Sequence, residues 1–133
     1  MPSLDSFISA WQARDPEAVA ARYAPNGVRV QTAHPSARIE GRAALTEHVR
    51  EIMTAWPDCT LETRPVVAAG DQVTLEWVFR GTQQADYGPL PGQGQPLELH
   101  GASVMEMRDG LIAEERVYWD TATLMAAAGV LPE

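Results

Sequence analysis

The amino-acid sequence predicts an α+β fold in which helices cover one side of a curved antiparallel sheet. Apolar residues recur with the helical period of about 3.6 residues through the first 56 positions. From residue 60 to residue 119 they alternate with polar residues, as in half-buried strands, and one more short helical segment follows. A bent sheet closed by helices forms a cone with one open end, which is a ready pocket. The chain shows no repeat and no linker, so residues 1–133 are predicted to form a single domain.

Three helices and one short strand are predicted in the first part of the chain. Residues 3–13 form the first helix, with Ser3 as its N-cap. The second helix begins at the N-cap Asp15, which precedes a proline at the first helical position, and ends at the Pro25-Asn26-Gly27 turn. Residues 28–32 are predicted to form a strand. The most regular helix covers residues 42–56, and its apolar face is formed by Leu45, Val49, Ile52, Met53 and Trp56.

The remainder of the chain is predicted to be mainly strands. They cover residues 60–67, 73–80, 97–107 and 112–119. Turn residues connect the first pair at Gly70-Asp71 and the last pair at Asp109-Gly110, and a loop rich in glycine and proline runs from residue 86 to 96. A C-terminal helix over about residues 121–128 has Asp120 as its N-cap and Gly129 as its C-cap.

Composition and charge exclude several classes of function. The 133 residues carry a formal net charge of −8 and contain no basic cluster, which argues against a surface for nucleic acid or anionic membrane. The single cysteine, Cys59, cannot form an intramolecular disulfide. The N-terminal segment lacks the features of an export signal, and no apolar run approaches the roughly 20 residues of a membrane span. We therefore expect a cytoplasmic protein.

Several short motifs, most of them in the second half of the chain, occur together in one known family. They are Arg80-Gly81-Thr82, the Pro- and Gly-rich loop up to Gly94, Asp109-Gly110-x-Ile112 and Tyr118-Trp119-Asp120. With weaker matches in the first half, the chain resembles a SnoaL-like domain of the nuclear transport factor 2-like superfamily. This resemblance is specific for the fold and much less specific for the reaction.

The resemblance implies an α+β cone, a homodimer that associates through the sheet, an apolar pocket for a small hydrophobic ligand, and neither a metal nor an organic cofactor. In SnoaL-like cyclases an aspartate on the last strand removes a proton from carbon, and the resulting enolate closes a ring by attacking a carbonyl. This chain has Val117 at the position of that aspartate, and Met105 where a cyclase relative has a histidine. Neither side chain can transfer a proton.

Two acidic residues near the end of the last strand require separate interpretations. Ala113, Val117 and Trp119 form the more apolar face of the strand, and Asp120 has the opposite parity, so it is predicted to cap the C-terminal helix. Glu115 shares the parity of the apolar face and is the predicted catalytic base, because burial in a dry pocket would raise its pKa. The alternative is that Glu115 lies at the exposed end of the strand and pairs with an arginine.

Among the three histidines, His34 is the second candidate for proton transfer. It follows the first strand, and imidazole titrates near neutral pH, but a solvent-exposed loop position is an equal alternative. His48 is predicted to be a hydrogen-bonded histidine in the core or at its edge, and His100 to be exposed. The three lack the spacing of metal ligands, so no metal site is predicted.

Alternation also predicts which side chains line the pocket. Gln83 and Tyr118, or a bound water, are candidates to hold an enolate oxygen, although Tyr118 has outward parity. The loop at residues 86–96, with Tyr87 and Leu90, is a candidate lid. The predicted substrate-binding residues are Met53, Trp56, Trp77, Gln83, Ser103, Met105, Val117 and Trp119.

These residues support three functional hypotheses. The first is an enzyme that acts on a hydrophobic, polyketide-type carbonyl compound through an enolate, by cyclisation or isomerisation, with Glu115 or His34 as the base. The alternative is a non-catalytic protein that binds a hydrophobic ligand, because Val117, Met105 and Gln83 are non-titrating at positions where relatives have polar residues. The third is a dimerisation or scaffold module whose cone is filled by side chains.

Overall fold

A computed structural model of the chain describes residues 4–32 and 38–130. Its four helices are α1 (Asp5–Gln12), α2 (Pro16–Ala20), α3 (Arg42–Ala55) and α4 (Thr121–Ala127). Two predicted N-caps are confirmed, since Asp15 accepts a hydrogen bond from the Ala18 amide and Asp120 accepts one from the Ala122 amide. The predicted cap at Ser3 lies outside the described residues.

The strands form one six-stranded sheet in the order β2-β1-β6-β5-β4-β3. Sheet neighbours run antiparallel except for β1 and β6, which are parallel. The predicted α+β class is confirmed, and the parallel pair is a local departure from the predicted antiparallel arrangement. The strands are β1 (Tyr23–Gln31), β2 (Arg38–Glu40), β3 (Thr60–Ala69), β4 (Gln72–Gln83), β5 (Gln95–Arg108) and β6 (Leu111–Trp119).

Helix α2 is shorter, and strand β1 longer, than the sequence predicts. The Pro25-Asn26-Gly27 segment lies inside β1, at a register shift between Tyr23 and Val28, so its interpretation as a helix end was wrong. A Cβ atom at Gly27 would lie 2.8 Å from the Ile112 carbonyl oxygen, so only glycine fits against β6 at this bulge. The short strand β2 was not predicted.

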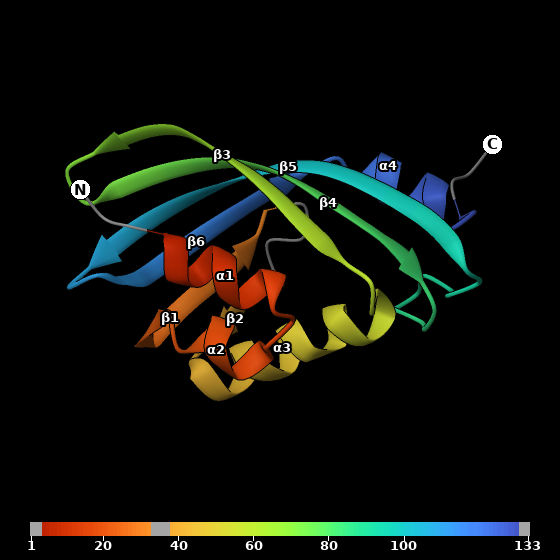
Figure 1. Cartoon of the computed structure of the whole chain (residues 1–133), viewed down its shortest axis with the longest axis horizontal. Coiled ribbons are helices and arrows are strands. Elements are labelled where there is room, and N and C mark those ends of the chain that lie inside the picture. The colour runs from red at the N-terminus through yellow and green to blue at the C-terminus, as the bar shows by residue number, and fades with distance from the viewer. Residues whose placement is uncertain (1–3, 33–37, 131–133) are drawn as a thin grey trace.

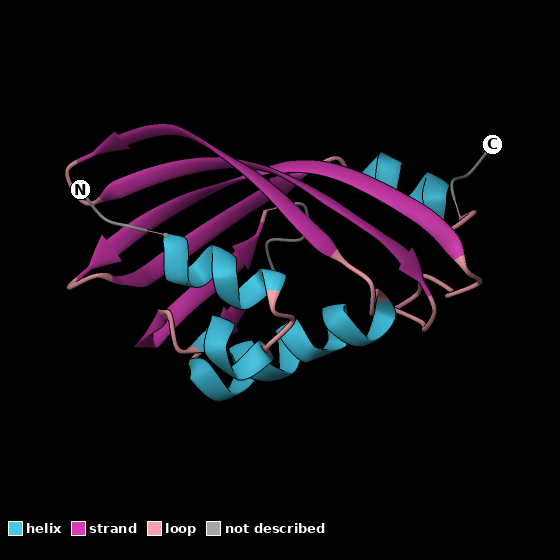
Figure 2. Ribbon diagram, viewed as in Figure 1, coloured by secondary structure: helices cyan, strands magenta, loops and turns pink. Residues whose placement is uncertain are grey.

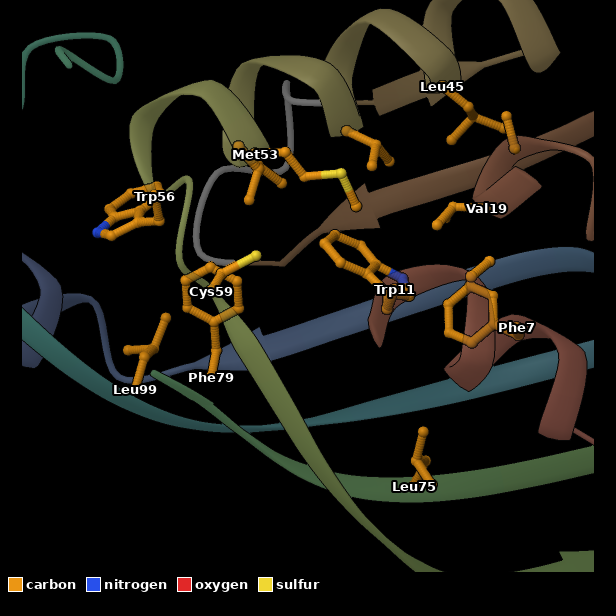
Figure 3. Packing of buried hydrophobic residues seen from close by; sticks show 14 of the residues in the cluster. Phe7, Trp11, Val19, Leu45, Met53, Trp56, Cys59, Leu75, Phe79 and Leu99 are labelled. Atoms are coloured by element: carbon orange, nitrogen blue, oxygen red, sulfur yellow. The ribbon is translucent and has the colours of Figure 1, made fainter. Parts of the chain in front are cut away.

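The sheet arches over α1, α2 and α3, and α4 lies at the far end of the molecule, in contact with β5 (Figures 1 and 2). The hydrophobic core fills the space between the sheet and the three helices. Figure 3 shows Phe7 and Met53 on the helical side, with Leu75, Phe79 and Leu99 pointing toward them from the sheet. This arrangement leaves the inner face of the sheet as the wall of any enclosed site.

Side chains that face each other across neighbouring strands point to the same side of the sheet, so the register defines rows on its inner face. One row crosses four strands and ends in an ion pair: Val73, Met105, Glu115 and Arg29. The next row contains Leu75, Ser103, Val117 and Gln31. A third contains Trp77, Gly101 and Trp119. Polar side chains therefore enter the interior where β1 meets β6.

Candidate functional site

A largely apolar cavity lies between the inner face of the sheet and the helices. It has a volume of about 80 Å³ and opens to solvent. All four tryptophans and both phenylalanines of the chain line it, so its wall is rich in aromatic rings. The complete lining comprises Phe7, Trp11, Arg29, Gln31, Ile52, Trp56, Leu61, Leu75, Trp77, Phe79, Tyr87, Leu97, Leu99, Ser103, Glu115, Trp119 and Leu124.

A buried cluster of Glu115, Arg29 and Tyr23 is the main polar feature of the cavity. Glu115 is only 2% exposed, and its Oε1 accepts a hydrogen bond from Arg29 Nη1 at 3.0 Å. The Tyr23 hydroxyl donates to the same oxygen. Oε2 has no hydrogen-bond partner among the described residues. Glu115 is also the one carboxylate among the described residues that line the cavity.

The surroundings determine the protonation of the two donors. Burial alone would lower the pKa of Arg29, but the negative charge of Glu115 and the interactions with Tyr23 and Tyr87 together outweigh it, and the pKa lies above its usual value. Burial, followed by the negative charge of Glu115, raises the pKa of Tyr23 well above 10.0. Arg29 is therefore a permanent cation and Tyr23 a neutral hydroxyl near neutral pH.

Next to this cluster, Gln31 lines the cavity and His48 lies behind it. Their Nε2 atoms are 2.9 Å apart, and both side chains are buried. Burial, with a further contribution from the positive charge of Arg29, lowers the pKa of His48 from 6.5 to about 3. The imidazole is therefore neutral at physiological pH. The prediction that His48 is a buried, hydrogen-bonded histidine is confirmed.

The tryptophans of the cavity differ in whether their ring N–H has a partner. Trp77 Nε1 donates to Ser103 Oγ at 3.2 Å. In contrast, Nε1 of Trp56 and of Trp119 are buried and lack a partner within the described part of the chain. The Nε atom of Arg29 is in the same state.

With the cavity described, comparison with known proteins places the chain in a family. The model of the SnoaL-like polyketide cyclase family matches residues 4–128. The chain belongs to this family. No curated protein sequence matches it.

Solved structures support the same fold for this SnoaL-like chain. IdmH from Streptomyces antibioticus, described as a candidate polyketide cyclase, is 26% identical with a TM-score of 0.76, and the match covers 96% of each chain. A candidate SnoaL-like polyketide cyclase from Jannaschia sp. CCS1 is 21% identical with a TM-score of 0.83, covering 97% of this chain and 90% of the other. A hypothetical protein from Catenulispora acidiphila with a ketosteroid isomerase-like fold, in complex with trimethylamine, is 21% identical with a TM-score of 0.81 and coverages of 96% and 92%.

Five of the predicted site residues of this SnoaL-like chain line the cavity. They are Trp56, Trp77, Ser103, Glu115 and Trp119. Glu115 is buried, as predicted, and it is paired with an arginine, but not at the exposed end of the strand as the alternative expected. The predicted base His34 lies outside the described residues.

Four other predicted residues are buried beside the cavity and do not line it. Met53, Met105 and Val117 are covered by neighbouring core side chains. Gln83 cannot hold an enolate oxygen, because its amide is already used within the protein. Its Nε2 donates to the carbonyl oxygens of Ala85 and Leu90, and its Oε1 accepts from Gln95 Nε2. These bonds fix the loop that was a candidate lid.

Residues with outward parity lie outside the cavity, as the alternation predicted. Tyr118 is 45% exposed, so it cannot hold an oxyanion in the interior. Asp120 caps α4 and is exposed, and its Oδ2 accepts a hydrogen bond from Thr123 Oγ1 that lowers the pKa of the carboxyl group. His100 is exposed as predicted.

Arg29 and Gln31 are the functional residues that the sequence analysis missed. Residues 28–31 alternate as Val-Arg-Val-Gln, and this pattern alone favours an outward position for the two polar side chains. In the structure they point inward, because Glu115 and His48 offer partners there. Within residues 4–32 and 38–130, no group of three or more His, Cys, Asp or Glu side chains is placed to hold a metal ion. No helix in these ranges is long and apolar enough to cross a membrane.

Proposed function

We propose that this SnoaL-like protein is an enzyme that acts on a hydrophobic carbonyl compound through an enolate, with Glu115 as the base. One observation supports this proposal above the others: a carboxylate with a free oxygen lies in an apolar cavity, directly beside a permanently charged arginine. Proton abstraction next to a carbonyl needs a base and a stabiliser of the developing negative charge. Glu115 and Arg29 supply the two groups.

Glu115 Oε2 accepts a proton from the carbon next to the carbonyl, the electrons of the C–H bond form a C=C bond, and the carbonyl oxygen becomes an oxyanion. The positive charge of Arg29 stabilises that oxygen. In a cyclisation the enolate carbon then attacks a second carbonyl, and the new alkoxide takes the proton back from Glu115. In an isomerisation the proton returns to a different carbon of the same substrate.

Tyr23 supports the proposal in a different way. Its hydroxyl donates to Oε1, and Arg29 donates to the same atom, so the carboxylate is held in one orientation with Oε2 left for the substrate. Fixed placement of a base removes much of the entropic cost of the reaction. The role of His34, the predicted homodimer and the cytoplasmic location stay predictions.

A non-catalytic ligand-binding protein is the second candidate, and two observations favour it. Val117 stands where the family resemblance expects the catalytic aspartate, and it is buried beside the cavity. In addition, Oε1 of Glu115 already accepts two hydrogen bonds from the protein, so only Oε2 is available to a substrate.

Hydrogen–deuterium exchange at C2 of 1-indanone, followed by ¹H NMR in D₂O, tests the proposal. The wild type should accelerate exchange, and Glu115→Gln should reduce the acceleration by about 10²–10⁴-fold, the usual contribution of a general base. Glu114→Gln is the matched control, because Glu114 is the neighbouring acid on the other face of β6 and pairs with Arg116. His34→Ala tests the other candidate base.

If 1-indanone binds but its C2 hydrogens exchange no faster than in buffer alone, the result would contradict the enzymatic proposal and support the ligand-binding protein. In that case Val117→Asp, which restores the acid that the family resemblance expects, is the next variant to measure. Exchange by this variant alone would identify a cavity that has lost its catalytic acid.

A further inference from the structure

The cavity contains buried hydrogen-bond donors that have no partner within the described part of the chain. They are Arg29 Nε and the ring nitrogens of Trp56 and Trp119, and all three residues line the cavity. Native proteins pair nearly all their buried donors, with protein groups, ordered water or a ligand. Three unpaired donors around one cavity therefore indicate what its occupant offers.

Two of the acceptor atoms in the cavity are already occupied. Glu115 Oε1 accepts from both Arg29 and Tyr23, and Ser103 Oγ accepts from Trp77. Glu115 Oε2 is the acceptor that the proposed reaction uses. The other unpaired groups, Arg29 Nε and the indole nitrogens of Trp56 and Trp119, are donors. A complementary ligand brings acceptor atoms, such as carbonyl oxygens.

The rest of the wall selects for flat, apolar molecules. Rings of Trp, Phe and Tyr surround the cavity, and Trp56 is held by Phe79 and Tyr87, with ring centroids 5.6 and 5.3 Å away. Aromatic walls by themselves also suit an ammonium ion. Here the unpaired groups are hydrogen-bond donors and Arg29 carries a full positive charge, so a cation is disfavoured.

We propose that Trp56 and Trp119 recognise the oxygen atoms of a flat, uncharged ketone by donating their indole N–H groups to them. Figure 3 shows the ring nitrogen of Trp56 pointing away from Cys59 and Phe79. The inference rests on the proposed function in placing the ligand in this cavity, but it concerns binding and not turnover.

Two probes that differ by one carbonyl group, 1-indanone and indane, test the inference in ¹H–¹⁵N NMR titrations of the full chain. The wild type should bind 1-indanone at least about tenfold more tightly than indane, as expected for two hydrogen bonds. Trp56→Phe and Trp119→Phe keep a flat ring but remove the donor, and each should reduce this preference by about three- to tenfold. Tyr118→Phe is the control, because it removes an aromatic hydrogen-bond donor that lies outside the cavity.

The same titration of the wild type gives a readout that does not depend on the folding of any variant. On addition of 1-indanone, the indole N–H resonances of Trp56 and Trp119 should move downfield, and indane should not move them in this way. The inference is overturned by equal affinity for the two probes, by tighter binding of phenyltrimethylammonium, or by an equal loss of preference in Tyr118→Phe. These outcomes are independent of the exchange rate of Glu115→Gln, so this inference and the proposed function can fail separately.

Discussion

His48 makes the stability of the protein depend on pH, and its position allows the size of the effect to be worked out. The imidazole is buried behind Gln31, and burial and the charge of Arg29 lower its pKa from 6.5 to about 3. In the unfolded chain the same group takes up a proton as the pH falls through 6.5. Below that pH the unfolded state binds more protons than the folded state, so acid must destabilise the fold.

The magnitude follows from the interval between the two pKa values. Between the unfolded value of 6.5 and the folded value of about 3, each unit of decrease in pH removes about 1.4 kcal/mol from the free energy of unfolding. At about pH 4.5 the loss due to His48 alone amounts to about 3 kcal/mol. That is a large part of the roughly 5–15 kcal/mol by which a domain of this size is stable.

Urea denaturation of the wild type and of His48→Gln, at several pH values from about 7.5 to about 4.5, measures this contribution. The variant keeps a hydrogen-bonding partner for Gln31 but has no titrating group, so its free energy of unfolding should fall less steeply with acid. The comparison uses slopes, so a constant loss of stability in the variant does not affect it. His100→Gln, at an exposed position, controls for the loss of a histidine. Parallel slopes for wild type and His48→Gln would refute a buried neutral imidazole.

Three further predictions concern the elements around the cavity. Glu115→Leu should lower the free energy of unfolding by about 3–5 kcal/mol, because Arg29 is then buried without its counter-ion. The double variant Arg29→Met/Glu115→Leu should recover most of that loss. Equal stability of the single and the double variant in urea would contradict the argument. Gly101→Ala should lower the free energy of unfolding by about 1–3 kcal/mol, because the added Cβ atom would lie 2.3 Å from the Trp77 ring. An unchanged Tm would show that the ring moves freely. Asp120→Ala should lower the Tm by a few degrees, through loss of the α4 cap, and should leave 1-indanone binding unchanged; loss of binding would place Asp120 in the site.

The sequence predicted the parts of the site that depend on local alternation. Glu115 and Trp119 face inward because β6 alternates regularly from Glu115 to Trp119, and parity within that stretch needs no knowledge of the neighbouring strands. The predicted parity is wrong at Ala113, because a bulge in the pairing with β5 places Ile112 in the interior instead. Parity also predicted correctly that Met105 and Val117 are buried. It could not show whether they line the cavity, because empty space depends on how the surrounding side chains pack.

The sequence could not predict the partners of Glu115. Arg29 is 86 residues away from it along the chain, and the two meet only because β1 and β6 are parallel neighbours. The same applies to the Pro25-Asn26-Gly27 segment, whose residue types are typical of a helix end but which here forms a bulge fitted against β6. In both cases a contact between distant segments overrode a clear local pattern.

The parallel pairing of β1 with β6 also has a consequence for biosynthesis. The acid and its guanidinium counter-ion are supplied by the first and the last long strand, so a nascent chain still emerging from the ribosome cannot assemble them. Contacts of such high sequence separation form late and slow the search for the native topology. Ligand capture by this pair therefore requires that β6 has been synthesised and has docked beside β1.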